Sequence, residues 1–177
     1  MSASGYSHLA VSVADLDRGR DFYTRALWFE AGTGYEAAGR RVAALMEADA
    51  RRFRGVFLRR GPVLVELLAY DPPLVPAMTP RRADEIGYAH ISVVVEDLEA
   101  TIAAVVAAGG ELRTRLEIGF ADGASTVVFV TDPDGNRVEL IAHSTVAERD
   151  GHAGFLGLTG LGWPAAGLDP WTPSGSA

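Results

Sequence analysis

The sequence predicts an α+β protein whose two halves each fold as a strand, a helix and about three further strands. Residues 6–16 and 88–98 align without a gap and share a Tyr, a His, two Val and an Asp-Leu pair. A second match follows in the same order, because Val-Glu-Leu recurs at residues 65–67 and 138–140. Two matches in one order indicate an internal repeat, so each half is expected to contain the same elements.

Each half opens with a predicted strand followed by a helix. Aliphatic residues alternate with polar or small residues over 8–13 and 90–95, which is the period of a half-buried strand. In the first half Asp15 or Asp17 can cap a helix over about residues 18–27. In the second half Asp97 can cap a helix over residues 98–108, where the two glycines at 109–110 end it.

The remaining elements follow from short apolar runs and turn residues. Strands are expected at residues 56–59 and 63–69 in the first half, and at 126–130 and 137–142 in the second. The sequence Asp-Pro-Asp-Gly at residues 132–135 predicts a turn before the last strand. Residues 39–50 are expected to form a short helix, with a strand as the alternative.

We expect a single domain over residues 1–143 and an irregular tail over residues 144–177. Within the domain, module one would span 6–70, a proline-rich linker 71–86, and module two 87–143. The tail is rich in Gly, Pro, Trp and Leu without a clear period, so no regular element is predicted there.

Composition excludes several classes of site. The chain of 177 residues contains no cysteine, and its 16 basic residues are all arginine, so thiolate metal sites, cysteine nucleophiles and Schiff-base lysines are absent. A net charge of -7 argues against a nucleic-acid partner. No signal-like or membrane-length apolar segment is present, so we expect a cytoplasmic protein without a membrane partner.

The repeat singles out four candidate metal ligands: His8, Glu66, His90 and Glu139. Both histidines lie opposite the aliphatic row of their strand, and the glutamates occupy matching positions in the closing strands. If the halves pair by two-fold symmetry, the four side chains meet in one cleft. Two imidazoles and two carboxylates suit one divalent Ni, Co, Mn, Fe or Zn ion and leave two positions for substrate oxygens.

Each of the four residues also has an ordinary structural explanation. One histidine in an apolar strand is more often a hydrogen-bonded core residue than a ligand, and one glutamate can simply face solvent. Recurrence of all four at matched positions favours the metal site. His143 and His152 lack this support and are expected to be exposed.

Residues 8–16, 21–27 and 132–141 resemble the vicinal oxygen chelate (glyoxalase/bleomycin resistance/extradiol dioxygenase) superfamily. The ligand set is most similar to that of bacterial glyoxalase I and methylmalonyl-CoA epimerase. The resemblance covers about residues 6–143. It implies two tandem βαβββ modules that form a cupped mixed sheet around a metal site, and commonly a homodimer.

Departures from the family pattern reduce the number of candidate reactions and substrates. Ser12 and Tyr70 stand where similar glutathione-dependent enzymes have an arginine and an asparagine that serve glutathione. Phe129 stands where ring-cleaving dioxygenases have a tyrosine, and no histidine lies between His90 and His143. These differences disfavour both a glutathione substrate and ring cleavage.

The resemblance and the ligand set therefore favour a metal-dependent isomerase, epimerase or lyase acting on a small oxygenated substrate. A divalent ion holding the carbonyl oxygen makes the neighbouring C–H bond easier to ionise, and Glu66 and Glu139 are the candidate catalytic bases. A metal-dependent dioxygenase, or a small-molecule binding or resistance protein using the same cup, is the alternative.

Overall fold

The computed structural model describes residues 7–48, 52–71, 84–120 and 123–143. Module one contains β1 (Leu9–Ser12), α1 (Leu16–Arg25), β2 (Glu30–Ala38), α2 (Arg40–Leu45), β3 (Arg52–Arg60) and β4 (Val63–Asp71). Module two contains β5 (Ile91–Val94), α3 (Leu98–Ala107), β6 (Glu111–Phe120), β7 (Gly123–Thr131) and β8 (Arg137–His143). The proposed tail begins at residue 144, beyond the last described residue.

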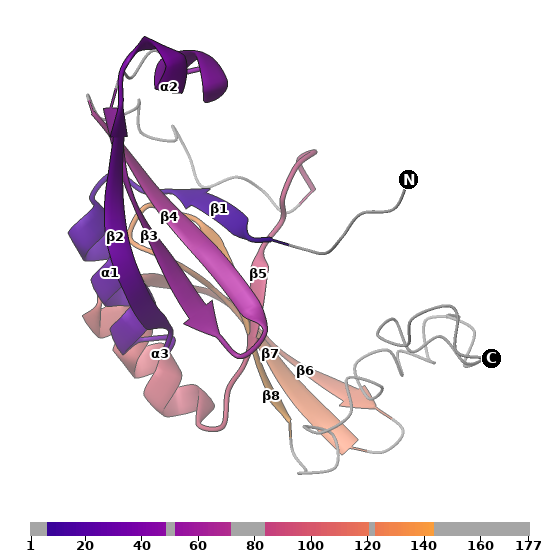
Figure 1. Cartoon of the computed structure of the whole chain (residues 1–177). Helices are drawn as coiled ribbons and strands as arrows, with labels where there is room; N and C mark the ends of the chain where they lie inside the picture. The colour runs from indigo at the N-terminus through magenta and orange to yellow at the C-terminus, as the bar shows by residue number, and fades with distance from the viewer. Residues whose placement is uncertain (1–6, 49–51, 72–83, 121–122, 144–177) are drawn as a thin grey trace, which may run out of the picture.

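The strands form two four-stranded mixed sheets with the same topology (Figure 1). The order is β1-β4-β3-β2 in module one and β5-β8-β7-β6 in module two. In each sheet the opening strand runs parallel to the closing strand, and the other neighbours are antiparallel. The register is also repeated, because Ala10 lies opposite Glu66 and Ser92 lies opposite Glu139. The predicted fold class of two tandem βαβββ modules is confirmed.

The two long helices begin at the predicted aspartates. Asp15 accepts a hydrogen bond from the Arg18 backbone N–H at 3.0 Å, and Asp97 accepts one from the Ala100 N–H at 2.9 Å. These bonds satisfy amide groups that a helix start leaves unpaired. Because Asp15 rather than Asp17 is the cap, α1 starts two residues before the predicted residue 18. The α3 helix ends before Gly109, whose φ of 87° is suited to glycine.

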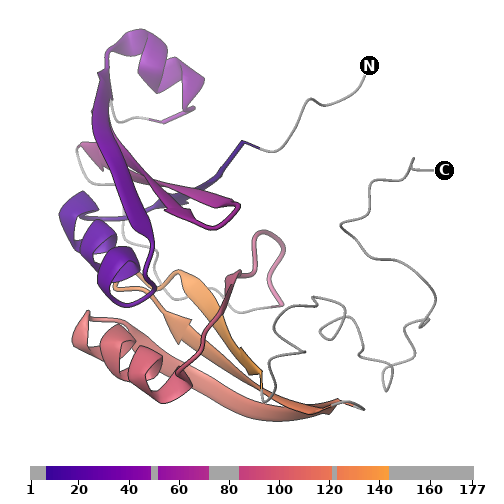
Figure 2. The ribbon, with the colours of Figure 1, turned by 60° about the horizontal axis from the view of Figure 1, so that its bottom comes forward.

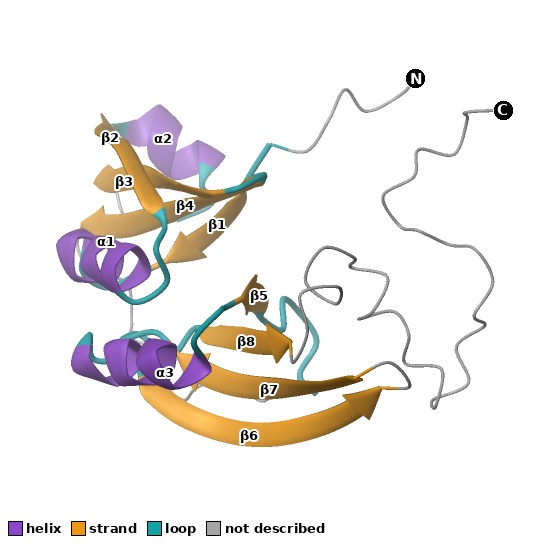
Figure 3. Cartoon of the chain, turned by 90° about the horizontal axis from the view of Figure 1, so that it is seen from below, coloured by secondary structure: helices purple, strands orange, loops and turns teal. Residues whose placement is uncertain are grey.

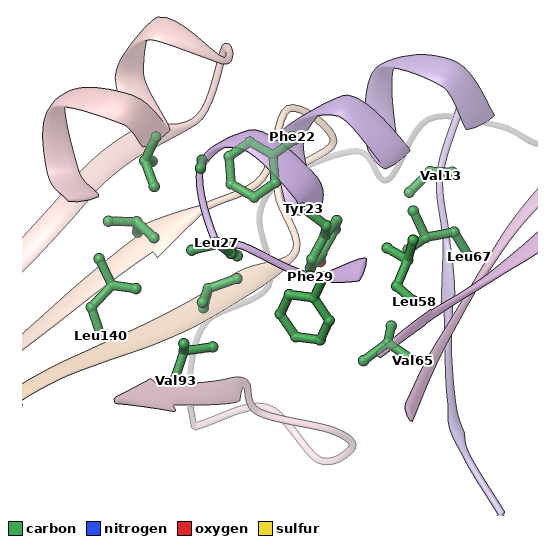
Figure 4. Close-up of a cluster of buried hydrophobic side chains, with 14 of the residues drawn as sticks. Val13, Phe22, Tyr23, Leu27, Phe29, Leu58, Val65, Leu67, Val93 and Leu140 are labelled. Atoms are coloured by element: carbon green, nitrogen blue, oxygen red, sulfur yellow. The ribbon is translucent and has the colours of Figure 1, made fainter. Parts of the chain in front are cut away.

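The two modules share one hydrophobic core. Figures 2 and 3 show α1 and α3 lying side by side, with the sheets of the two modules as separate layers. Phe22 of α1 and the following Leu27 are fully buried among side chains from the strands of both modules, including Leu140 (Figure 4). The core therefore occupies the helix-facing side of each sheet. The opposite sheet faces remain available for a functional site.

The turn at Asp132 ties module two to module one. The buried Asp132 carboxylate accepts backbone N–H groups of Asp134 and Asn136 at 2.9 and 2.8 Å, which confirms the predicted turn. It also accepts the hydroxyl of Tyr23 on α1 at 3.3 Å. Asp134 forms an ion pair with Arg18, also on α1. Polar contacts thus fix the relative position of the modules alongside the shared core.

Two strands lie where no strand was predicted individually. About three strands are expected after each helix, but apolar runs in the sequence locate only two in each half. The missing ones are β2 and β6, each of which lies at the edge of its sheet opposite the opening strand. The residues of β2 are mostly exposed and show little apolar alternation. The sequence of β6 alternates Leu112, Leu116 and Ile118 with charged residues, a strand signal that the prediction did not use.

The short helix expected within residues 39–50 is confirmed as α2 (Arg40–Leu45). In the described part of the chain, no helix has both the length and the apolar character that crossing a membrane requires.

Candidate metal centre

The first half of the centre is a histidine and a glutamate from the parallel strand pair of module one. Val65 and Leu67 of β4 are fully buried in the shared core, so the intervening Glu66 points to the opposite face of the sheet. His8 immediately precedes β1, and its Nε2 atom lies 3.1 Å from Glu66 Oε2. The Ser7 hydroxyl lies 2.9 Å from Nδ1 of His8. This contact helps to direct Nε2 toward the glutamate.

Module two repeats the arrangement. Glu139 lies between the buried residues Val138 and Leu140 of β8, so its carboxylate also points away from the core. His90 precedes β5, and its Nε2 atom lies 3.5 Å from Glu139 Oε2. Both glutamates are nearly enclosed, with exposed fractions of 8% for Glu66 and 7% for Glu139. Carboxylates are seldom buried to this degree without a partner, and each has an imidazole beside it.

A phenylalanine completes each half of the centre. Phe57 lies opposite Glu66 in the β3–β4 register, and Phe129 lies opposite Glu139 in the β7–β8 register. Each ring meets its histidine edge to face, with centroids 5.3 Å apart in both modules. Sequence reasoning did not name this role for either residue. The signal is present in the Val-Phe pair that both strands contain at matching positions.

The structure brings the four predicted ligands together in two pairs. In the described residues of a single chain, no group of three or more His, Asp or Glu side chains is placed to hold a metal ion. Each pair lies on the outer face of its own sheet, because the helices and the shared core lie on the inner faces. One chain therefore presents two separate half-sites.

The geometry of each half-site fits two ligands of one divalent ion. Histidine nitrogen and carboxylate oxygen bind first-row ions at about 2.0–2.2 Å, so two neighbouring ligand atoms on one ion lie about 3 Å apart. The observed separations are 3.1 Å in module one and 3.5 Å in module two. Imidazole and carboxylate are also the donors that such ions accept in a chain without cysteine.

One further side chain contacts this centre. Tyr35 of β2 donates a hydrogen bond from its hydroxyl to Glu66 Oε1, the oxygen that does not face His8. Burial and the hydrogen bond to Glu66 raise the pKa of Tyr35, so its hydroxyl stays protonated near neutral pH. The sequence signal for this contact is Gly55 within β3, because a glycine inside a strand often marks the close approach of another group.

The sequence model of the Glyoxalase/Bleomycin resistance protein/Dioxygenase superfamily matches residues 5–140. The chain belongs to this superfamily. Membership accounts for the repeated βαβββ topology and for the pairing of each opening strand with its closing strand. The glyoxalase family protein from Bacillus cereus has the same fold, with a TM-score of 0.69 and 13% sequence identity. That similarity covers 81% of this chain and 96% of the Bacillus protein.

Two curated members of the superfamily show the extent of sequence similarity. The lactoylglutathione lyase of Haemophilus influenzae is 47% identical over 60 residues, which are 33% of this chain and 43% of that enzyme. A putative lactoylglutathione lyase of Brassica oleracea is 29% identical over 153 residues, which are 81% of this chain and 46% of that protein. The matches thus span less than half the length of either relative.

Proposed function

We propose that the protein is a metal-dependent isomerase, epimerase or lyase that transfers a proton at the carbon beside a carbonyl group of a small oxygenated substrate. The repeated His–Glu pair carries this proposal, because its atoms are spaced as ligands of one ion in both modules. The names of the curated relatives support lyase chemistry of this kind. The native ion is one of Ni, Co, Mn, Fe or Zn, with His8, Glu66, His90 and Glu139 as its ligands.

The glutamates are the proton-transfer groups in this mechanism. A bound divalent ion would polarise the substrate carbonyl and offset the negative charge that develops on its oxygen. Glu66 and Glu139 hold their carboxylates on the face where the substrate would lie, away from the hydrophobic core. A carboxylate there can accept the proton of the neighbouring C–H bond and return it to the same or an adjacent carbon. Burial beside an imidazole keeps bulk water from competing for that proton.

We further propose that two copies of the chain build each centre. One chain presents two half-sites on the outer faces of different sheets, and a symmetric dimer can bring the His8–Glu66 half-site of one copy against the His90–Glu139 half-site of its partner. Ile86 and Tyr88, just before His90, are large exposed side chains that a partner could cover.

Metal content is the first test of the proposed function. Protein purified without a nickel column should contain about one divalent ion per chain by mass spectrometry. His8→Ala and Glu139→Ala should each lose most of that ion, while far-UV circular dichroism stays unchanged. Wild-type protein that cannot be loaded with any divalent ion would exclude the metal-dependent function and favour a small-molecule binding protein.

A mixing experiment tests the two-copy site. In a dimer with shared centres, His8→Ala and His90→Ala each damage every site, but a mixed dimer combines both substitutions in one site and leaves the other intact. Random exchange between equal amounts of the two variants should restore about one quarter of the wild-type metal sites. If each chain builds its own site, mixing restores nothing.

Activity assays separate the remaining alternatives. The expected activity is exchange of a C–H proton with solvent deuterium in α-hydroxycarbonyl compounds, tested with and without glutathione because Ser12 and Tyr70 do not supply the expected glutathione contacts. Glu139→Gln should remain folded and lose this exchange. Oxygen uptake by a ferrous form, without proton exchange, would instead identify a dioxygenase.

A further inference from the structure

Tyr35 distinguishes the two half-sites. It lies on β2, the outer strand of the sheet, whereas Glu66 lies on β4, with β3 between them. The tyrosine reaches across β3 and donates its hydroxyl proton to Glu66 Oε1. Because Glu66 Oε2 faces His8 at 3.1 Å, both oxygens of this carboxylate have a neighbouring group that fixes them.

The crossing depends on Gly55, which lies opposite Tyr35 in the β2–β3 register. A Cβ atom at residue 55 would lie 2.5 Å from Tyr35 Cζ, a separation that real Cβ atoms do not show. The ring is also held from its sides. It stacks on Phe57 with centroids 5.8 Å apart and meets Phe53 edge to face at 6.0 Å. Tyr35 is thus packed into one position from which its hydroxyl meets the carboxylate.

Module two has no counterpart of this contact in the described residues. Gly55 lies opposite Leu68 in module one, and Val127 lies opposite Ile141 at the matching position of module two. The residue opposite Val127 is Leu116, which carries no hydroxyl and is 60% exposed. A valine side chain also occupies the place that glycine leaves open.

The glutamate of module two therefore has different surroundings. His90 lies 3.5 Å from Oε2 of Glu139, and within the described residues no tyrosine donates a hydroxyl to Oε1 as Tyr35 does to Glu66. The oxygen Oε1 of Glu139 is not fixed in the way that Tyr35 fixes Oε1 of Glu66. Glu66 and Glu139 thus occupy matching positions in the two sheets, but in the described part of the chain only the Glu66 carboxylate accepts a hydrogen bond from a tyrosine.

We propose that Tyr35 is a positioning residue that holds Glu66 in one orientation as a fixed ligand, so that Glu139 is the carboxylate that removes and returns the substrate proton. This role rests on the proposed function. A fixed carboxylate cannot swing toward a substrate carbon without breaking the Tyr35 hydrogen bond. Glu139 can rotate its other carboxylate oxygen toward the C–H bond, accept the proton, and deliver it to the neighbouring carbon on the same side. Within the proposed function this selects an isomerase or lyase over an epimerase, because epimerisation needs a proton donor on the opposite face of the carbon.

Cobalt binding tests the positioning role without any substrate. Tyr35→Phe keeps the ring and its packing and removes only the hydroxyl. We expect this variant to bind Co²⁺ about 10- to 100-fold more weakly than wild type, the usual effect of losing a group that orients a ligand, and to shift the visible Co²⁺ absorption bands. Tyr70→Phe is the matched control, because Tyr70 also packs against Phe53 and lies near enough to Glu66 to interact with its charge, but makes no described hydrogen bond to it. It should bind Co²⁺ within about two-fold of wild type.

Product configuration gives a second readout on an active substrate. Wild type should deliver the proton to one face and give one enantiomer by chiral chromatography. Tyr35→Phe frees Glu66 to deliver a proton from the other side, so its product should be a mixture of enantiomers. Tyr70→Phe should keep the wild-type configuration.

The outcomes separate the two proposals. Wild-type protein that binds no Co²⁺ would overturn the proposed function and the positioning role together. Wild type that binds Co²⁺, with Tyr35→Phe unchanged in affinity and spectrum, would overturn the positioning role alone. Equal losses in Tyr35→Phe and Tyr70→Phe would also overturn it, because they would assign the effect to aromatic packing rather than to the Tyr35 hydroxyl.

Discussion

Replacing Tyr23 by Phe tests how strongly the buried link between the modules stabilises the fold. The Tyr23 side chain is fully buried, and its hydroxyl donates to the buried Asp132 carboxylate at 3.3 Å. The substitution keeps the ring contacts with Phe22 and Phe29, at 5.3 and 5.9 Å between centroids, so only the hydroxyl is lost. Asp132 still accepts hydrogen bonds from Asp134 and Asn136.

The expected loss is about 1.5 kcal/mol in the free energy of unfolding. Hydrogen bonds to charged groups contribute about 1.5–3 kcal/mol to stability. The lower end applies here because the observed 3.3 Å is longer than the typical O–H···O distance of about 2.7–2.8 Å. Urea unfolding followed by circular dichroism should show a lower midpoint with an unchanged slope. Tyr70→Phe, which removes a hydroxyl from a half-buried ring, should change stability by less than about 0.5 kcal/mol. An equally small loss in Tyr23→Phe would refute the stabilising role of this bond.

Three further predictions concern the core, the buried acid and the ion. Val105→Ala should lower the free energy of unfolding in urea by about 2 kcal/mol, because the Val105 side chain is 0% exposed. Val106 on the same helix is 55% exposed, so Val106→Ala should change this free energy by less than about 0.5 kcal/mol. Equal effects of the two substitutions would contradict the assigned buried face of the helix. Burial raises the pKa of Asp132 above the ordinary 3.8. Above pH 3.8 the unfolded chain therefore loses this proton before the folded chain does, and the free energy of unfolding falls as pH rises through the raised pKa. The pH dependence of unfolding in Asp132→Asn should lack this decrease, and a variant that retains it would assign the decrease to other groups. Removing metal with a chelator should abolish proton exchange while the far-UV circular dichroism spectrum remains, because the shared apolar core contains none of the four candidate ligands. Loss of the spectrum would show that the fold depends on metal.

The fold was predictable because the repeat and the helix caps are local signals. Asp15 and Asp97 begin helices in the structure as their chemistry predicts, and the closing strands β4 and β8 each contain a short, continuously buried run with one glutamate in it. The strand β2 was not located because its residues are mostly exposed and include few apolar side chains. The sequence of β6 does alternate Leu112, Leu116 and Ile118 with charged residues, so its strand signal was present and was missed. The pairing partners of both strands are set by the register of the whole sheet, which a short sequence window does not contain.

The candidate ligands were predictable for a different reason, which also explains why Tyr35 was missed. A repeat identifies residues that both halves share, so His8 and His90 stand out together with their glutamates. The same comparison hides any residue that one half has and the other lacks. Tyr35 contacts Glu66 only because Gly55 leaves room for its ring, whereas module two has Val127 and Leu116 in the corresponding places.

Residues that the two modules share and residues in which they differ thus have separate consequences for the proposed chemistry. Matching residues define where an ion can be held, because the sheet register repeats and brings an imidazole and a carboxylate together in each module. Residues that differ define what each carboxylate can do, because proton transfer needs one group that moves while the ion stays in place. A centre with two identical half-sites would have no reason to prefer one glutamate as base. Under the proposed function, the Tyr35–Glu66 hydrogen bond supplies that preference, and the departure from symmetry determines which glutamate acts as the base.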